Sequence, residues 1–343
     1  RDLHKEYRRQ RQMCIRDRES IKDLSGPVVL HIVTKKGKGL EIAENDPVKY
    51  HGVKAQDGNK DQSTISPSPI FQNVFGSLCC NLAEENKDIV CITAAMKEGT
   101  GLVGFSEKFP DRFFDVGIAE AHATTFAAGL STAKKIPIVA IYSTFLQRAY
   151  DQVIHDIAIQ KLPVIFCLDR SGLAGEDGAT HHGALDISYM RCIQGMTVTA
   201  PKDGNELRDL LYTAIDNKTG PFSIRYPKES SIAFDEGISG QVLKIGSWEV
   251  LNRGNNVVIL AVGSMVNKAM DIAKKLENNN MSCEVVNCRF IKPMDQHYLN
   301  DSLRNFSKII TLEEGVINGG FGEGIAAWSV SYTHLTLPTI LLV

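Results

Sequence analysis

Long hydrophobic runs, a strong charge of one sign and internal repeats are all missing from this sequence of 343 residues. The longest apolar runs, such as residues 257–262, fall far short of the roughly 18 residues that a membrane-spanning helix requires. A formal net charge of −2 gives no reason to expect nucleic acid or an anionic membrane as a partner. The apolar and charged content is that of an ordinary globular protein, and the length predicts two domains.

The eight cysteines include no CxxC pair, and most lie inside apolar runs. In that setting they are expected to be small core residues rather than metal ligands or redox centres. A secretory signal is also missing, so we expect a cytoplasmic protein of bacterial type, with a plastid as the alternative compartment.

Both ends look foreign to the rest of the chain. Residues 1–18 combine seven Lys or Arg with three acids and show no periodic apolar face. Residues 330–343 form an uncharged, β-prone tail that breaks off a helical pattern. We expect both segments to be artefacts of sequence assembly and exclude them from the fold argument, although a genuine helix remains the alternative for residues 1–18.

Apolar strand patterns alternate with helical patterns through the rest of the chain. This alternation is typical of an α/β fold with a parallel sheet covered by helices on both faces. The predicted strands are 28–34, 89–93, 136–142, 164–169, 196–199 and 222–226, and the predicted helices are 70–82, 120–130, 147–161 and 205–215. After a polar stretch, a smaller α/β domain is predicted, with strands 248–251, 257–262, 283–287 and 308–312 and helices 266–276 and 295–303.

The chain is organised around residues 115–130, which read DVGIAEAHATTFAAGL. Glu120 begins a helix of small residues and has mainly apolar neighbours, so its carboxylate is expected to be desolvated and ready to share a proton with a ligand nitrogen. The alternative is that Glu120 only favours the positive end of the helix dipole. The segment that follows the next strand, YSTFLQRAYDQ at residues 142–152, favours the first interpretation.

Residues 115–130 and 142–156 together resemble the pyrimidine-binding domain of thiamine-diphosphate enzymes. Within that group the likeness, from about residue 28 to about residue 328, is to the transketolase-like 1-deoxy-D-xylulose-5-phosphate synthase family. The resemblance implies a parallel-sheet pyrimidine-binding domain at 69–227, a linker at 228–241 and a truncated transketolase C-terminal-like domain at 242–329. It also implies that residues 19–51 are the tail of a diphosphate-binding domain, followed by a linker at 52–68.

The resemblance implies a thiamine-diphosphate-dependent transferase. The family transfers a two-carbon unit from pyruvate, with decarboxylation, to glyceraldehyde 3-phosphate, and its product feeds isoprenoid and thiamine biosynthesis. A homodimer is the implied assembly. The family holds the diphosphate through Mg²⁺ with a Gly-Asp-Gly loop, which this sequence lacks. We therefore expect no metal ligand in this chain, and expect the fragment to be inactive alone because its Mg²⁺ ligands lie upstream.

The cofactor-binding residues can be carried over from the family one by one. Glu120 matches the glutamate that exchanges a proton with N1′ of the aminopyrimidine, and Phe145 matches the residue whose ring stacks on it. Arg148 and Met96 are the further expected cofactor contacts. His51 matches a histidine that reaches the active site from the first domain.

The substrate-binding residues lie in later segments. Tyr142, Arg170 and Arg225 match residues that contact the substrate phosphate, for which forked guanidinium hydrogen bonds are well suited. Asp177 and His181 match residues that bind the hydroxyl and carbonyl groups and assist proton transfer. Without the family match, Arg225 could equally be a salt-bridging strand residue, and His181 a solvated loop residue.

Two other functions stay open at this point. The chain could be the beta-type subunit of a two-chain 2-oxo acid dehydrogenase, although the strand-like segment at 28–39 argues against this. It could also be a non-catalytic homologue that acts as an assembly module, although the presence of Glu120 and Phe145 argues against that.

Overall fold

The computed structural model describes residues 15–16, 18–47, 50, 69–331 and 340–341. The chain separates into two compact units, Arg1–Ile65 and Ser66–Val343. His51, the predicted linker 52–68 and most of residues 1–18 lie outside the described residues. Among the helices that are described, none is long and apolar enough to cross a membrane.

The first unit holds a short helix, α2 (Glu41–Asn45), after a turn at residues 36–39. The prediction of a strand at 28–34 was wrong. These residues take no strand conformation and their side chains are exposed, with Val29 93% exposed. An apolar run becomes a strand only when a neighbour satisfies its backbone hydrogen bonds, and no described residue pairs with this segment.

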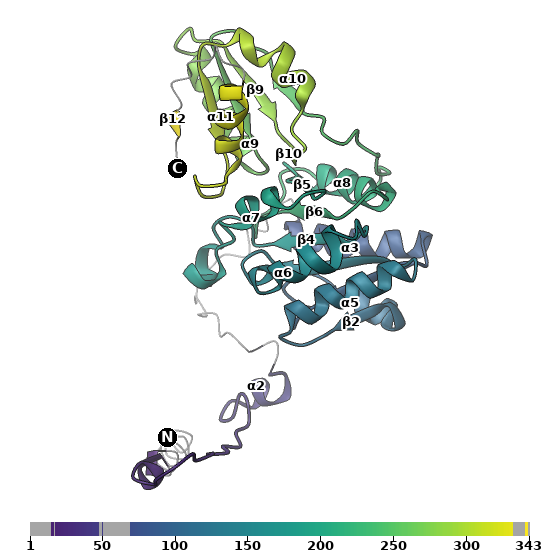
Figure 1. Ribbon diagram of the computed structural model, residues 1–343, viewed down its shortest axis with the longest axis vertical. Helices are drawn as coiled ribbons and strands as arrows, with labels where there is room; N and C mark the ends of the chain where they lie inside the picture. The colour runs from purple at the N-terminus through teal and green to yellow at the C-terminus, as the bar shows by residue number, and fades with distance from the viewer. Residues whose placement is uncertain (1–14, 17, 48–49, 51–68, 332–339, 342–343) are drawn as a thin grey trace. The chain divides into compact units, whose positions relative to one another are not determined.

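The second unit contains a seven-stranded sheet in the order β10-β5-β6-β4-β3-β1-β2 (Figure 1). Its strands are β1 (Ile89–Thr93), β2 (Phe113–Asp115), β3 (Ile136–Tyr142), β4 (Ile165–Asp169), β5 (Thr197–Thr199), β6 (Phe222–Arg225) and β10 (Phe290–Lys292). Strands β1 to β6 pair in parallel, and β10 is antiparallel to β5. The inner strands β1 and β4 are buried along their whole length, as expected for a sheet covered on both faces.

One helix, α3 (Phe71–Glu85), precedes the first strand, and the other helices connect the strands by crossovers. The other helices are α4 (Val103–Lys108), α5 (Glu120–Thr132), α6 (Tyr150–Gln152), α7 (Asp186–Cys192) and α8 (Gly204–Asp216). Because crossovers between parallel strands are right-handed, those that run toward β2 and those that run toward β5 must cover opposite faces. The packing of α3 on α4 and α8, and of α5 on the segment after β3, agrees with this expectation.

The helix predicted at 147–161 takes a less regular form. Phe145–Ala149 is a 3₁₀ turn, α6 follows, and Val153–Ala158 is π-helical. Leu146, Ala149, Val153 and Ile157 are fully buried and keep a helical spacing of three or four residues. The apolar pattern was therefore correct, but it does not distinguish between helix types, and π-helical turns often occur at functional sites.

A second, five-stranded sheet has the order β12-β11-β8-β9-β7. Its strands are β7 (Glu249–Asn252), β8 (Val257–Ala261), β9 (Cys283–Asn287), β11 (Ile309–Leu312) and β12 (Ile340–Leu341), and its helices are α9 (Met265–Glu277), α10 (Gln296–Asp301) and α11 (Phe321–Ser331). Strand β12, from the tail predicted to be an artefact, pairs in parallel with β11.

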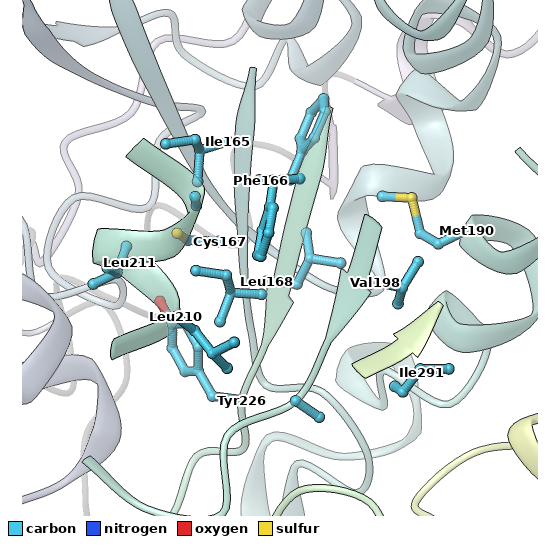
Figure 2. Packing of buried hydrophobic residues seen from close by; sticks show 14 of the residues in the cluster. Ile165, Phe166, Cys167, Leu168, Met190, Val198, Leu210, Leu211, Tyr226 and Ile291 are labelled. Atoms are coloured by element: carbon cyan, nitrogen blue, oxygen red, sulfur yellow. The ribbon is translucent and has the colours of Figure 1, made fainter. Parts of the chain in front are cut away.

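One face of the small sheet shares a hydrophobic core with the large sheet, and its other face forms a second core with α9. Figure 2 shows residues of the shared core: the β4 side chains with Leu210 and Leu211 of α8 and Tyr226, and, farther from β4, Val198 and Ile291. Ile291 belongs to β10, which comes from the C-terminal part of the chain yet completes the large sheet. Each fully buried large apolar side chain contributes roughly 1.5–3 kcal/mol, so this crossover couples the two domains substantially.

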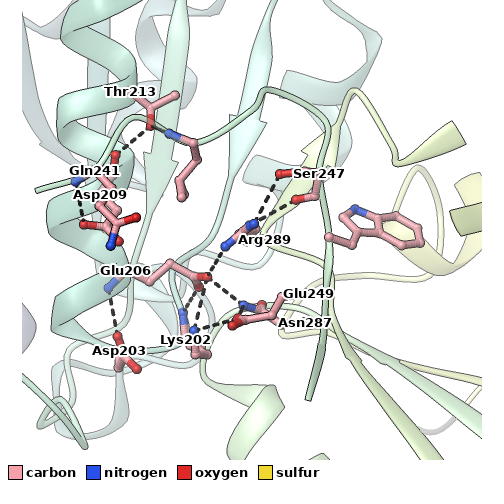
Figure 3. A network of polar contacts seen from close by, with 12 residues as sticks. Lys202, Asp203, Glu206, Asp209, Thr213, Gln241, Ser247, Glu249, Asn287 and Arg289 are labelled. Atoms are coloured by element: carbon pink, nitrogen blue, oxygen red, sulfur yellow. Dashed lines mark hydrogen bonds and ion pairs between the residues drawn. The ribbon is translucent and has the colours of Figure 1, made fainter. Parts of the chain in front are cut away.

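A polar network also joins the two domains (Figure 3). Glu206 of α8 accepts a hydrogen bond of 2.7 Å from Asn287 of β9 and forms ion pairs with Lys202 and Arg289. Lys202 also reaches Glu249 of β7 at 2.9 Å. Burial raises the pKa of Glu206, although the charges of Lys202 and Arg289 act in the opposite direction.

Candidate active site

The predicted site residues gather where the parallel strands of the large sheet end. Met96 follows β1, Glu120 begins the helix after β2, Tyr142 is the last residue of β3, and Arg170 comes directly after β4. Loops at the carboxyl ends of parallel strands are the usual position of ligand sites in α/β proteins.

Glu120 is the first residue of α5 and is only 4% exposed. Within the described residues no group donates a hydrogen bond to its carboxylate, and its one charged neighbour is Arg148, with Nη1 at 3.7 Å from Oε1. Arg148 itself is mostly exposed. A buried carboxylate that lacks hydrogen-bond donors is energetically costly, which is the condition expected of a group that receives a donor from a ligand.

Phe145 lies in a cluster of aromatic rings. It stacks with Tyr142 at a centroid distance of 5.7 Å and an interplanar angle of 19°, and it meets the edge of His181 at 5.3 Å. The guanidinium of Arg148 lies 6.0 Å from the Phe145 centroid. Because Arg148 contacts both Phe145 and Glu120, these two residues are on the same side of the sheet.

Met96 and Tyr142 belong to the same end of the site as Phe145 and His181, which is the aromatic end. The Met96 side chain is buried, and its Sδ lies 3.4 Å from the backbone nitrogen of Tyr142. Burial raises the pKa of the Tyr142 phenol to about 12, so the hydroxyl is a neutral hydrogen-bond donor near neutral pH. The guanidinium of Arg170 stacks on the Tyr142 ring, with Cζ at 3.9 Å from the centroid.

Arg170 is buried and held on several sides. Nη1 donates to the Gly99 carbonyl oxygen at 2.7 Å and to Gln72 Oε1 at 3.4 Å, and Nε donates to Asp177 Oδ2 at 3.2 Å. Asp169 contacts both the backbone nitrogen and Nη1 of Arg170. Nη2 makes no hydrogen bond to any described residue, so it is the donor left for a ligand.

The pKa values of two carboxyl groups beside Arg170 are shifted in opposite directions. Burial raises the pKa of Asp169 to about 7, only partly opposed by Arg170, and Oδ2 has no hydrogen-bond partner among the described residues. Burial also acts against ionisation of Asp177, but its hydrogen bond of 2.6 Å from Lys228 and the charge of Arg170 outweigh this effect and lower the pKa.

Arg225, at the end of β6, has other partners. Nε donates to Asp186 Oδ2 at 2.8 Å, and Nη2 donates to the carbonyl oxygen of Glu314 at 2.9 Å. Burial raises the pKa of the Glu314 side chain, although the Arg225 charge opposes this rise. Among the described residues, Arg225 makes no hydrogen bond, ion pair or ring contact with the aromatic end of the site, so it forms a separate part of the site.

The structure therefore brings most of the predicted residues into one chain of contacts. Glu120, Arg148, Phe145, Tyr142, His181, Met96, Arg170 and Asp177 are linked in this way. His51 lies outside the described residues. The sequence analysis gave no role to Asp169, Asp186, Lys228 or Glu314; a polar residue that ends a buried strand could have indicated Asp169, but no pattern distinguishes the other three.

The residues present fit the pyrimidine end of thiamine diphosphate. The fit rests on the buried Glu120 carboxylate that lacks a donor and on the aromatic rings that share Arg148 with it. For Mg²⁺ the case differs: within the described part of the chain, no group of three or more His, Cys, Asp or Glu side chains is arranged to hold a metal ion.

Comparisons with known families agree with this geometry. Residues 69–231 match the family described as transketolase, pyrimidine binding domain, and residues 246–342 match transketolase, C-terminal domain. A solved split-gene transketolase, described as an inactive beta4 tetramer, is 30% identical with a TM-score of 0.71, covering 80% of this chain and 88% of its own. The chain belongs to the transketolase family.

The curated relatives are similar to this chain at higher identity, and they share one name. A 1-deoxy-D-xylulose-5-phosphate synthase from Aquifex aeolicus is 52% identical over 89% of this chain and 49% of its own length, and one from Dictyoglomus thermophilum is 50% identical over 90% and 49%. This transketolase-family chain thus spans about half the length of the curated relatives it matches. A Pichia stipitis transketolase, at 19% identity and a TM-score of 0.62, shares the fold.

Proposed function

We propose that this chain supplies the pyrimidine-binding and C-terminal domains of a 1-deoxy-D-xylulose-5-phosphate synthase. The reaction is the transfer of a two-carbon unit from pyruvate, with loss of carbon dioxide, to glyceraldehyde 3-phosphate, in a cytoplasmic homodimer that uses thiamine diphosphate and Mg²⁺. The observation that carries the proposal is the buried Glu120 carboxylate, which accepts no hydrogen bond from the described residues and shares Arg148 with Phe145. Similarity to the curated synthases supports the choice of substrates.

Each residue has a distinct role in this proposal. When bound, thiamine diphosphate supplies the carbon nucleophile and the electron sink for decarboxylation. Glu120 accepts and returns a proton at the aminopyrimidine nitrogen, in a site dry enough for the exchange to be selective. Phe145 holds the ring by stacking, and Met96 and Arg148 border it.

The acceptor occupies the other end of the site. Nη2 of Arg170 and Nη1 of Arg225 are the guanidinium nitrogens without hydrogen bonds to the described residues, so they are the donors available to the phosphate. Tyr142, whose phenol stays protonated, is a third donor. Asp177 contacts Arg170 and His181 contacts the Tyr142 ring, and in this proposal they bind the carbonyl and hydroxyl groups of the acceptor.

The proposal can be tested in a fusion protein that joins the upstream half of the Aquifex aeolicus relative to this chain. The assay measures formation of 1-deoxy-D-xylulose 5-phosphate. In the active protein, Glu120→Gln should lower kcat by at least about 100-fold, the usual effect of losing a proton-transfer group. Glu107→Gln, an exposed glutamate on α4, is the matched control and should retain full activity. Turnover above a few per cent in Glu120→Gln would contradict the proton-exchange role.

A two-chain assembly is the second candidate. It is favoured by the similarity to the split-gene transketolase, whose beta chain is described as an inactive tetramer. In that case the present chain should gain activity when it is mixed with a separately produced diphosphate-binding domain. Activity only in the fused protein would favour the single-chain synthase, and no activity in either form would favour a non-catalytic assembly module.

The isolated chain should bind thiamine diphosphate weakly. The reason is that, among the described residues, no cluster of acidic, histidine or cysteine side chains is arranged to hold Mg²⁺ beside a diphosphate. Calorimetric titration of the 343 residues with cofactor and Mg²⁺ checks this expectation. Micromolar binding that requires Mg²⁺ would contradict it.

A further inference from the structure

Asp186 is a buried carboxylate whose oxygens are both taken by its own chain. It is 1% exposed and is the first residue of α7. Oδ2 accepts hydrogen bonds from Arg225 Nε at 2.8 Å and from Ser171 Oγ at 3.0 Å, and Oδ1 accepts one from the Ile187 nitrogen at 2.9 Å. Asp186 therefore accepts at least three hydrogen bonds from its own chain, and both of its oxygens hold other groups in place.

These bonds fix the orientation of Arg225. Its guanidinium is planar, and it is held at Nε by Asp186 and at Nη2 by the Glu314 carbonyl oxygen. Two hydrogen bonds at one edge of a rigid plane set the direction of the remaining donors. With the side chain only 5% exposed, Nη1 is left without a hydrogen bond to any residue that the structure describes.

The second anchor comes from the C-terminal domain. Glu314 follows β11, and its side chain approaches Ser264 Oγ at 3.3 Å. It also fits closely against Gly172 in the loop after β4: a Cβ at that glycine would lie 2.8 Å from Glu314 Cβ. The C-terminal domain thus places a carbonyl oxygen where it holds an arginine of the large sheet.

We propose that Asp186 is a positioning residue for the acceptor phosphate and acts through Arg225 together with the Glu314 carbonyl oxygen. This inference rests on the proposed function. Asp186 balances the charge of Arg225 and presents Nη1 to a phosphate oxygen. Asp186 also accepts a hydrogen bond from Ser171, which follows Arg170 in the chain. The same carboxylate therefore also restrains the backbone beside Arg170.

The experiment compares two acceptors in the complete, active enzyme: glyceraldehyde 3-phosphate and unphosphorylated glyceraldehyde. Asp186→Asn should raise KM for the phosphorylated acceptor about tenfold, because a charge-assisted hydrogen bond is worth about 1.4 kcal/mol or more. KM for pyruvate and kcat/KM for glyceraldehyde should change by no more than about twofold, since neither depends on a phosphate contact. Equal losses with both acceptors would overturn the proposal.

A double-mutant cycle separates positioning from a general effect on the fold. Arg225→Lys removes the planar group that Asp186 holds, so Asp186→Asn in that background should have no further effect on KM for the phosphorylated acceptor. Additive losses would overturn the proposal. If Asp186→Asn does not fold, Ser171→Ala, which removes one bond to Oδ2, must selectively raise the same KM, and an unchanged value would then count against it.

The experiments distinguish an error in the proposed function from an error in the role of Asp186. If the complete enzyme turns over neither acceptor, the proposed function is wrong, and the inference is decided by titrating the 343-residue chain with inorganic phosphate. The wild-type chain should bind phosphate, and Asp186→Asn should bind it about tenfold more weakly. Equal affinities, or no binding to the wild-type chain, would overturn the inference.

Discussion

Replacing Asp169 by Asn should remove a pH dependence from the stability of this chain. The Asp169 side chain is fully buried at the end of β4, and its Oδ2 has no hydrogen-bond partner within the described residues. Burial raises its pKa from the ordinary 3.8 to about 7, against the opposing charge of Arg170. Since one pKa unit corresponds to about 1.36 kcal/mol, the rise is worth roughly 4 kcal/mol.

The sign of the effect follows from proton binding. Between about pH 4 and pH 7 the folded chain keeps the proton on Asp169 while the unfolded chain releases it. Folding stability from this group is therefore fully present below pH 3.8 and is lost progressively as the pH rises to about 7, where it levels off. Asn cannot ionise, but its carbonyl oxygen can still accept the hydrogen bond from the Arg170 nitrogen.

Denaturant unfolding of both proteins at pH 5, 6, 7 and 8 measures this effect. The wild-type free energy of unfolding should fall relative to Asp169→Asn by roughly 2 kcal/mol between pH 5 and pH 7, and by less than about 0.5 kcal/mol between pH 7 and pH 8. Asp177→Asn is the matched control: the lowered pKa of Asp177 means that its stabilisation is lost only in acid, so its curve should run parallel to the wild type over this range. Parallel curves for Asp169→Asn would refute the reasoning.

Two further predictions concern the cofactor end and the domain boundary. In the active protein, Phe145→Ala should weaken thiamine diphosphate binding about tenfold, through the loss of stacking and of buried ring area, and an unchanged affinity by calorimetry would contradict the stacking role. Glu206→Gln should lower the free energy of unfolding by roughly 3 kcal/mol, because it removes a buried partner of Lys202 and Arg289, whereas the exposed Glu107→Gln should leave it unchanged in the same denaturant titration.

The sequence predicted the parallel α/β architecture because its apolar runs are long and regular. Strands β1 and β3 have the predicted bounds, and α5 begins at Glu120 as expected. The run at 28–34 is equally apolar but forms no strand, since pairing partners decide whether such a run becomes one. Likewise no periodicity could show that β10 crosses from the C-terminal part of the chain to the large sheet, because three residues carry too little pattern.

For the candidate site, the sequence predicted the residues that resemble a family motif and missed those that hold them. Phe145 and Arg148 lie within one 3₁₀ turn, so their proximity follows from the chain itself. Asp186 and Glu314 reach Arg225 from segments that are 39 and 89 residues away. Contacts of that range depend on the final packing, which a single sequence does not reveal.

The partners of the two arginines decide how a phosphate can bind here. Arg225 is paired with the almost fully buried Asp186, and Arg170 is paired with Asp177, whose pKa is lowered, so neither arginine is a free positive charge that awaits an anion. Removing such a carboxylate would leave an uncompensated buried charge, which costs several kcal/mol, so a phosphate does not displace the carboxylates. In the proposed site it would bind instead to donors that the carboxylates have already oriented. The affinity then comes from preorganisation rather than from net charge, because little side-chain freedom remains to be lost on binding. The positioning carboxylates are accordingly as much a part of the proposed site as the arginines that we propose to contact the phosphate.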